Sequence, residues 1–429
     1  MIGVLATQQQ ELAGKYRPYP EYKDSGITRL GAIPSHWQPK KLKRMASIEN
    51  GRDYKHVEAT EGFPVIGSGG QFTWSEQYLY SGESVLLGRK GTVDKPLYIN
   101  GSFWTVDTMF YTKVGKTIPA KFLYYAALTI EFGLYSTNTA LPSMTQEDLG
   151  NIHFGSPSYG EAENIAAFLD YETSRIDRLI AKQQQLIELL KEKRQAVISH
   201  AVTKGLNPDA PMKDSGVEWL GKVPEQWEVV PTKRFFRLVA KPAPENNDFE
   251  LLSVYTDIGV KPRKELEQRG NKSSTTDGYW LVKKGDIVVN KLLAWMGAVG
   301  YSDYSGVTSP AYDILRATRP INSKFYHYLF RADIAQKEFK RWSRGIMEMR
   351  LRLYFDELGR ILMPFPSKDE QDYIVAYIEK MERQFEHLAS KMSEQIALLQ
   401  ERRSALISAA VTGKIDLRGW TQPSNEVAA

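Results

Sequence analysis

KDSGITRLGAIPSHW (residues 23–37) and KDSGVEWLGKVPEQW (residues 213–227) are two copies of one motif. Eight of the fifteen positions are identical at a constant separation of 190 residues: Lys, Asp, Ser, Gly, Leu, Gly, Pro and Trp. The second copy is also close to a phosphate-binding loop, but Val223 stands where such a loop needs Ser or Thr after Lys222. The first copy has Ala32 in place of that lysine. The shared feature is therefore a folded turn, and the chain is built from a repeat.

A second repeat follows the first. Residues 157–206 align without a gap with residues 366–415, at a separation of 209 residues. Both stretches begin with Pro-Ser and carry Ala-Val-Thr near their ends. The two separations differ by 19 residues, which indicates an insertion in the second half of the chain. Repeats of this size predict two domains, because a solenoid consists of more and shorter units.

The composition is that of an ordinary globular protein. Of 429 residues, 42% are hydrophobic and 25% are charged, and the net charge is +5. No apolar run approaches the roughly 18 residues of a membrane helix, and the N-terminus lacks a signal-peptide pattern. Cysteine is absent, which excludes disulfides, thiolate catalysis and cysteine-ligated metals. We therefore expect a cytoplasmic protein.

The second repeat predicts two long helices. Alternating steps of four and three residues from Ile165 and from Ile374 meet apolar residues at seven and eight of ten positions. A period of 3.5 residues over about five heptads is typical of a coiled coil. We expect the helices to pair antiparallel; the alternative is that each packs only on its own globular region. The predicted seam comprises Ile165, Leu169, Ile176, Leu179, Leu186, Leu190, Val197, Ile374, Ile378, Phe385, Leu388, Leu399 and Leu406.

These patterns predict an α+β fold with two globular α/β domains joined by two long antiparallel coiled-coil helices, as a pseudo-twofold internal repeat. Gly205 and Gly413 stand where the helices should end. The expected segments are an N-terminal segment (1–36), a first globular domain (37–156), a first helix (157–206), a linker with the second motif copy (207–226), a second globular domain (227–365), a second helix (366–417) and a C-terminal tail (418–429).

Charge and motifs favour binding over catalysis. Residues 227–365 contain 23 Lys and Arg against 16 Asp and Glu, whereas residues 37–156 contain 12 against 11. A basic excess on one domain is typical of phosphate binding. The six histidines lack metal-ligand spacing, and neither a nucleophile elbow nor a dinucleotide fingerprint occurs. We therefore expect no catalytic residue and no metal site.

One tetrapeptide, Ser309-Pro310-Ala311-Tyr312, is similar to the target-amine motif of adenine methyltransferases. That motif has a second proline where this chain has Ala311. A glycine-rich turn for the methyl donor does not precede it. The tetrapeptide therefore does not predict methyl transfer by this chain.

The order of motif, globular region and helix, repeated once, resembles the specificity subunits of type I restriction-modification systems over about residues 17–417. The two KDSG motifs and the two ExRxAxISxAVT helix ends carry the resemblance most specifically. GESVLLGRKGTV, FWTVDTMFY and LPSMTQEDLGNIHFGSP in the first globular region are also similar to domains of that family. In the second region the same holds for VKKGDIVVNKLLAWMGAVG, VTSPAY and MRLRLYFDELGRILMPFP.

The resemblance implies a subunit that recognises DNA and has no active site of its own. Each globular region would be a target-recognition domain that reads one half of a bipartite, gapped site in double-stranded DNA. The helices would set the gap and dock two copies of the adenine-methylating subunit, which motor-nuclease subunits would then join. S-adenosylmethionine, ATP and Mg²⁺ would bind to those partners.

DNA-facing residues are expected in loops of both globular regions. Small residues let the backbone approach phosphates, Arg and Lys can bond to guanine edges, and Asn can bond to adenine. The candidates in the first region are Gly67, Ser68, Gly69, Arg89, Lys90, Thr92 and Asn138. Those in the second region are Asn290, Lys291, Trp295, Ser309, Tyr312, Arg344, Arg350 and Arg352.

Two other classes of function stay open at this point. One is a single-chain DNA-modifying enzyme, which binding of S-adenosylmethionine by the isolated chain would reveal. The other is a two-headed scaffold that binds only proteins. A steep fall of DNA affinity with salt would argue against the scaffold.

Overall fold

The computed structural model describes residues 16–135, 142–265, 276–346 and 350–423. This part of the chain forms two compact units: residues 16–184 with 393–423, and residues 185–392. Each unit contains one motif copy, one globular region and a stretch of each long helix. No helix of the described residues is long and apolar enough to cross a membrane.

The repeated motif folds as a β-hairpin in both units. β1 (Tyr22–Asp24) pairs antiparallel with β2 (Ala32–Pro34), and β12 (Met212–Asp214) pairs with β13 (Lys222–Pro224). The aspartate accepts a hydrogen bond from the N–H of the motif's first glycine, over 3.0 Å in the first copy and 2.9 Å in the second. This glycine has a positive φ, 69° and 72°, which costs other residues strain. The prediction of a turn rather than a phosphate loop is confirmed.

The globular region of the first unit contains a seven-stranded sheet in the order β4-β10-β8-β9-β6-β7-β5. Only β6 and β9 pair in parallel within it. Successive residues of β8 point to opposite faces, and Val85 and Leu86 are both buried, so both faces are covered. The elements are β3 (Gln38–Lys41), β4 (Ala46–Asn50), β5 (Glu58–Ala59), β6 (Phe63–Gly67), β7 (Gly70–Ser75), β8 (Tyr80–Gly88), β9 (Leu97–Thr105), β10 (Met109–Val114), α2 (Ala120–Ala127), α3 (Gln146–Asn151) and β11 (His153–Ser156).

The globular region of the second unit has a smaller, four-stranded sheet in the order β15-β22-β19-β20. The buried face of α5 packs into the core that contains this sheet, and Asn322 caps α5 by accepting from the Lys324 N–H over 3.0 Å. The elements are β14 (Glu228–Pro231), β15 (Phe236–Val239), β16 (Leu252–Tyr255), β17 (Gly259–Pro262), β18 (Trp280–Val282), β19 (Ile287–Asn290), β20 (Val299–Tyr301), β21 (Gly306–Thr308), β22 (Tyr312–Ala317), α5 (Ser323–Arg331), α6 (Asp333–Trp342), α7 (Phe355–Leu358) and β23 (Leu362–Phe365).

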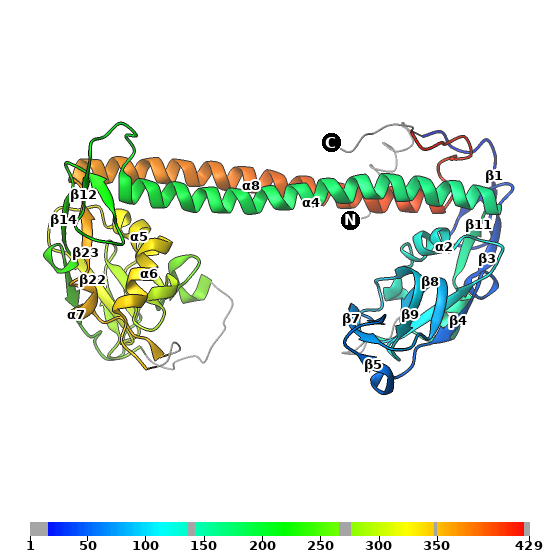
Figure 1. Ribbon diagram of the computed structural model, residues 1–429, viewed down its shortest axis with the longest axis horizontal. Coiled ribbons are helices and arrows are strands. Elements are labelled where there is room, and N and C mark those ends of the chain that lie inside the picture. The colour runs from blue at the N-terminus through cyan, green and yellow to red at the C-terminus, as the bar shows by residue number, and fades with distance from the viewer. Residues whose placement is uncertain (1–15, 136–141, 266–275, 347–349, 424–429) are drawn as a thin grey trace. The chain divides into compact units, whose positions relative to one another are not determined.

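Two long helices, α4 (Tyr159–Lys204) and α8 (Lys368–Val411), run antiparallel and side by side within each unit (Figure 1). In the first unit, Gln183 donates to Gln395 over 3.0 Å, and in the second, Arg194 forms an ion pair with Glu382. Both hydrophobic cores contain residues of both helices. The predicted α+β fold with antiparallel coiled-coil helices is confirmed.

The seam between the helices differs from the predicted one at three positions. Leu179, Leu186 and Leu388 are 50%, 45% and 46% exposed, so their assignment to the seam is wrong. The neighbours Ile180 and Ile187 are half-buried instead. Because Leu179-Ile180 and Leu186-Ile187 are both apolar pairs, the pattern does not decide whether a step of three or of four comes first.

The remaining predicted seam residues are covered to different degrees. Leu190, Val197 and Leu399 are half-buried. Those that are buried are Ile165, Leu169, Ile176, Ile374, Ile378, Phe385 and Leu406. The predicted phase is therefore correct at residues such as Ile176, Leu190 and Leu406, and it is displaced by one residue at Leu179 and Leu186.

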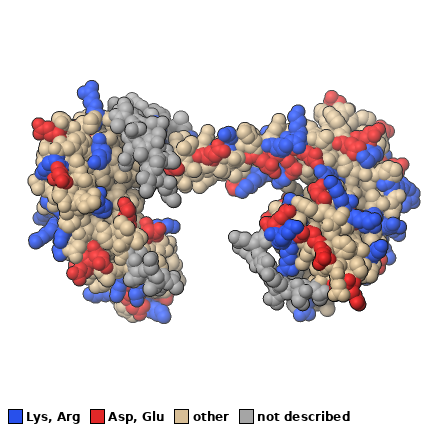
Figure 2. Space-filling view, turned by 180° about the vertical axis from the view of Figure 1, so that it is seen from behind, with Lys and Arg blue, Asp and Glu red and all other residues tan. Residues whose placement is uncertain are grey.

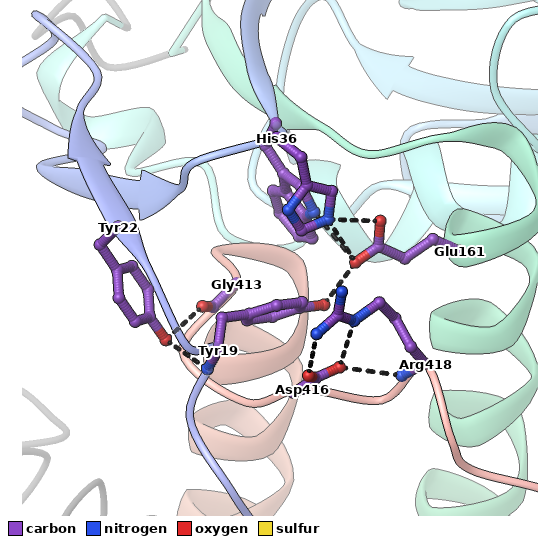
Figure 3. A network of polar contacts seen from close by, with 8 residues as sticks. Tyr19, Tyr22, His36, Glu161, Gly413, Asp416 and Arg418 are labelled. Carbon is purple, nitrogen blue, oxygen red and sulfur yellow. Dashed lines mark hydrogen bonds and ion pairs between the residues drawn. The ribbon is translucent and has the colours of Figure 1, made fainter.

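A buried carboxylate joins distant parts of the first unit (Figure 3). Glu161, in the first turn of α4, accepts hydrogen bonds from the hydroxyl of Tyr19 over 2.6 Å and from Nε1 of Trp37 over 3.1 Å. Nε2 of His36 lies 3.0 Å from its second oxygen. Burial and the Glu161 carboxylate raise the pKa of Tyr19, so its phenol stays protonated and keeps donating.

The end of the chain contacts the same cluster. The guanidinium of Arg418 lies 5.1 Å from the ring centroid of Tyr19 and forms an ion pair of 2.6 Å with Asp416. The hydroxyl of Tyr22 donates to the carbonyl of Gly413 over 3.0 Å. The segments before β1 and after α8 are thereby tied to the start of α4.

The cluster predicts unequal effects for one substitution in the two repeats. Glu161→Ala should lower the free energy of unfolding by about 2–4 kcal/mol, because two buried donors lose their acceptor. Glu370, its repeat counterpart, is half-buried, so Glu370→Ala should change it by about 0.5 kcal/mol or less. Urea denaturation of both variants measures this difference; equal losses would contradict the structural role of the cluster.

The corrected seam predicts unequal effects for two adjacent residues. Ile187 lies one turn after Gln183 and two turns before Arg194, both of which bond to α8, whereas Leu186 is exposed. Ile187→Ala should therefore destabilise the chain by about 1–2 kcal/mol and Leu186→Ala by less than about 0.5 kcal/mol. Denaturant midpoints of the two variants, at an unchanged m-value, test which residue lies in the seam. A larger loss for Leu186→Ala than for Ile187→Ala would support the seam predicted from the sequence.

Candidate nucleic-acid interface

Two candidates of the first unit lie beside the turn between β9 and β10. The N–H groups of Arg89 and Lys90 donate to the carbonyl of Thr108 over 2.8 and 3.2 Å. Nη1 of Arg89 donates to the carbonyl of Asp107 over 3.3 Å, while Lys90 is exposed. The backbone at the end of β8 is thus held in place, and the ammonium of Lys90 extends from it.

The glycine-rich turn between β6 and β7 lies beside the same β9–β10 turn. A methyl group on Gly67 would stand 3.5 Å from Cγ2 of Val106 and 3.2 Å from the ring of Phe72. Ser68 and Gly69 form the tip of this turn, and Gly69 is exposed with open space around it. The structure therefore brings the 67–69 turn and Arg89–Lys90 to one edge of the sheet.

The remaining two candidates of this unit are Thr92 and Asn138. Thr92 is half-buried, and its carbonyl lies close against Gly88 at the end of β8. Asn138 lies outside the described residues. Sequence reasoning missed Arg52, whose N–H donates to the carbonyl of Thr105 over 2.8 Å at this same edge, and the exposed Phe72. Arg52 is a cation directly after a glycine, as Arg89 is, and this shared feature could have identified it as a candidate.

In the second unit, candidates gather where β19 ends and β22 begins. Asn290 and Tyr312 are directly opposite each other in the β19–β22 pair. Nζ of Lys291 donates to the carbonyl of Pro310 over 3.0 Å, and Oγ of Ser309 accepts from the N–H of Ala311 over 3.2 Å. Ser309-Pro310-Ala311-Tyr312 is therefore the turn that leads into β22, fastened to the end of β19.

Three arginines lie on an adjoining pair of segments. The backbones of Arg344 and Arg352 exchange two hydrogen bonds of 2.9 Å each. The guanidinium of Arg344 forms a 2.6 Å ion pair with the buried carboxylate of Glu357, so this arginine holds the segments in place. Arg350 and Arg352 are exposed and are better placed to contact a ligand.

Two side chains of this unit that were predicted to face DNA form hydrogen bonds to the neighbouring backbone. Asn290 is buried, and its Oδ1 accepts from the N–H of Leu292 over 3.1 Å. Trp295 is half-buried, and its Nε1 donates to the carbonyl of Leu292 over 3.0 Å. Both side chains therefore stabilise the turn after β19. The expected exposure of Asn290 to DNA is corrected, whereas contact of the half-buried Trp295 ring with DNA stays a prediction. The missed feature is that Leu292, Leu293 and Met296 are exposed on that turn.

The basic excess of the second unit does not form a single continuous patch on the face seen in Figure 2, where basic and acidic side chains are interspersed. Several basic side chains are paired, among them Arg316 with Asp286 at 2.6 Å and Lys324 with Glu379 at 2.7 Å. No group of three or more His, Asp and Glu in the described chain could hold a metal ion. The net charge of a region therefore overestimates how many exposed basic side chains are left without an acidic partner.

The pair formed by Lys291 and Asp313 predicts a pH-dependent effect. Nζ of Lys291 lies 3.4 Å from Oδ1 of Asp313, and burial raises the pKa of Asp313 even though Lys291 opposes the shift. Lys291→Met should destabilise the chain by about 1–3 kcal/mol at pH 7, because a buried carboxylate loses its counter-charge.

The loss should shrink as the pH falls through the raised pKa of Asp313 in the folded variant, since the protonated acid needs no counter-charge. Urea denaturation at pH 7 and pH 5 measures it, with Lys284→Met at an exposed lysine of the same unit as the control. An equal loss at both pH values would contradict the pairing.

Comparison with known proteins finds similar proteins over most of the chain. Residues 34–189 match the model of the type I restriction modification DNA specificity domain. The chain is 22% identical to the type I restriction enzyme EcoBI specificity subunit of Escherichia coli, over 92% of this chain and 90% of that protein. It is 24% identical to the MjaVIII specificity subunit of Methanocaldococcus jannaschii, over 78% of this chain and 76% of that protein.

Solved structures show the same fold. A chain from a study of complex assembly and conformational transition of the type I R-M system superposes with a TM-score of 0.62 at 14% identity, over 88% of this chain and 98% of the other. The HsdS subunit of Thermoanaerobacter tengcongensis gives 0.51 at 13% identity, over 89% and 98%. The resemblance carried by the KDSG motifs is thereby confirmed: this chain is similar, over most of its length, to the specificity subunits of type I restriction-modification systems.

Proposed function

We propose that this chain is the DNA sequence-recognition subunit of a type I restriction-modification complex. The observation that carries the proposal is the match of the whole duplicated plan, which covers 92% of this chain and 90% of a relative named as a specificity subunit. Each globular region would read one half of a bipartite, gapped site in double-stranded DNA.

The two units present different candidate residues for contact with DNA. The first unit presents a glycine turn with Arg89 and Lys90 at the edge of a seven-stranded sheet, whereas the second presents Arg350 and Arg352 beside a four-stranded one. Two frameworks that differ in this way would read different bases, so we propose an asymmetric site. Half-sites read on one face of B-DNA lie about 34 Å or a multiple of it apart.

The helices and the partners complete the proposal. The helices α4 and α8 would set the gap between the half-sites and dock two adenine-methylating subunits, one for each repeat. Motor-nuclease subunits would join that complex. This chain would be non-catalytic, and S-adenosylmethionine, ATP and Mg²⁺ would bind to the partners.

A genome-wide map of N6-methyladenine tests this function. Cells that express this chain with its cognate methylating subunit are compared with cells that express the methylating subunit alone. We expect methylation at one gapped, asymmetric sequence that depends on this chain. An unchanged map would contradict a working specificity subunit.

Arg350 provides a local test of DNA contact. If its guanidinium contacts a base, Arg350→Ala should weaken binding of the cognate DNA by about 1–3 kcal/mol and relax the preference at one position. Arg360→Ala, at an exposed arginine of the same unit after α7, is the matched control and should change affinity little. Fluorescence anisotropy with labelled duplexes at fixed salt measures both; unchanged affinity for Arg350→Ala would remove this residue from the interface.

A further inference from the structure

In the first unit, the segment after α8 folds back over the helix pair. Ile415 and Leu417 are buried in the core of the unit. The ring of Trp420 packs edge-on against Phe168, with centroids 5.5 Å apart, and lies 6.1 Å from the ring of Tyr171. An aliphatic and an aromatic side chain three residues apart thus cover this face of the helix pair.

The matching face of the second unit is open. At the repeat separation of 209 residues, the counterpart of Phe168 is Tyr377, and their side chains are 1% and 37% exposed. Ala405 and Ala409 are buried in the first unit, whereas their counterparts, Ala196 and His200, are exposed. Tyr377, Ala196 and His200 line a groove of about 400 Å³ together with Lys193, Gly205 and Leu206.

Chain connectivity explains the difference. In the first unit, the segment before β1 and the segment after α8 are two separate pieces of chain, and both pack on the helices. In the second unit, one piece, residues 205–211, must both leave α4 and enter β12. A single short connection cannot supply the second covering segment, so the groove remains.

A polar group beside the groove also lacks its partner. Nε1 of the fully buried Trp227 has no hydrogen-bond partner among the described residues, whereas Nε1 of its counterpart Trp37 donates to Glu161. A methyl group on Gly205, which lines the groove, would stand 3.4 Å from Cζ2 of Trp227 and 3.6 Å from Oε1 of Glu370. The indole edge and the carboxylate therefore lie next to the groove. An unpaired buried N–H is costly.

We propose that this groove binds an extended segment of a partner polypeptide that carries an aliphatic and an aromatic side chain three residues apart, as Leu417 and Trp420 are. Lys193 lines the groove and would attract an acidic residue in that segment. The helix pair therefore offers two unequal surfaces, one closed by the chain itself and one left for a partner.

The tail of a second copy is a poor occupant for this groove. Ile415 and Leu417 are 1% and 2% exposed in their own unit, so a second copy would have to expose them in order to donate its tail. That exchange would lose as much apolar burial as it gains. A chain with a free segment of the same chemistry does not meet this penalty. The inference goes beyond the proposed function, and its test needs no DNA, so the two can fail separately.

A peptide with the tail sequence GKIDLRGW (residues 413–420) is the probe, titrated as a fluorescent conjugate against the full chain. We expect saturable binding of one peptide per chain, measured by anisotropy. A peptide in which both Leu417→Ala and Trp420→Ala are made should bind at least about tenfold more weakly, which is about 1.4 kcal/mol. Absence of binding, or equal binding of the two peptides, would overturn the proposal.

Two matched variants locate the peptide. Ala196→Trp fills the groove from an exposed position and should abolish binding without changing the unfolding midpoint. Lys191→Trp, at an exposed residue five positions earlier and on another side of α4, should leave binding unchanged. Binding that survives Ala196→Trp would place the peptide elsewhere and overturn the proposal. So would self-association of the wild-type chain in sedimentation that Ala196→Trp removes, since the occupant would then be a second copy.

Discussion

The antiparallel pairing of α4 and α8 is the constraint on which both units depend. The core of the first unit contains Ile165 of α4 and Leu406 of α8, and that of the second contains Val202 of α4 and Ile374 of α8. Neither core is contiguous in sequence, because each combines helix residues about 170 to 240 positions apart. A globular region separated from either helix would expose part of its apolar core, so folding of each unit requires both helices.

Polar groups then distinguish two units that share a plan. Glu161 joins Tyr19 and Trp37 in the first unit, and a carboxylate with several donors specifies one arrangement of its neighbours. The second unit keeps the tryptophan and the glutamate, Trp227 and Glu370, but not the tyrosine. The repeat has thus been retained in its hairpins and helices, while the surfaces beside them have diverged.

The sequence predicted where the candidate interface lies better than it predicted the role of each residue in it. Loops selected for glycines and cations do gather at one edge in each unit, because strand ends that are adjacent in a sheet bring their loops together. Burial then separates the roles: Asn290 and Lys291 bond to the local structure, whereas Arg350 and Arg352 are exposed. Sequence does not show this separation, because a polar residue type serves equally well for capping a turn and for contacting a ligand.

The repeated KDSG turns, the two long helices, their antiparallel sense and the family resemblance could all be predicted from the sequence alone. The turns follow from the repeated KDSG motif, and the helices follow from apolar residues every 3.5 positions. The antiparallel sense follows from the order in which the chain connects the helices and the globular regions. The folded structure was needed to show that Ile187 rather than Leu186 faces the partner helix, and that the tail covers one helix surface while the counterpart of that surface stays open. Adjacent apolar residues leave the helix phase undetermined, and coverage depends on which segments the fold brings together in space.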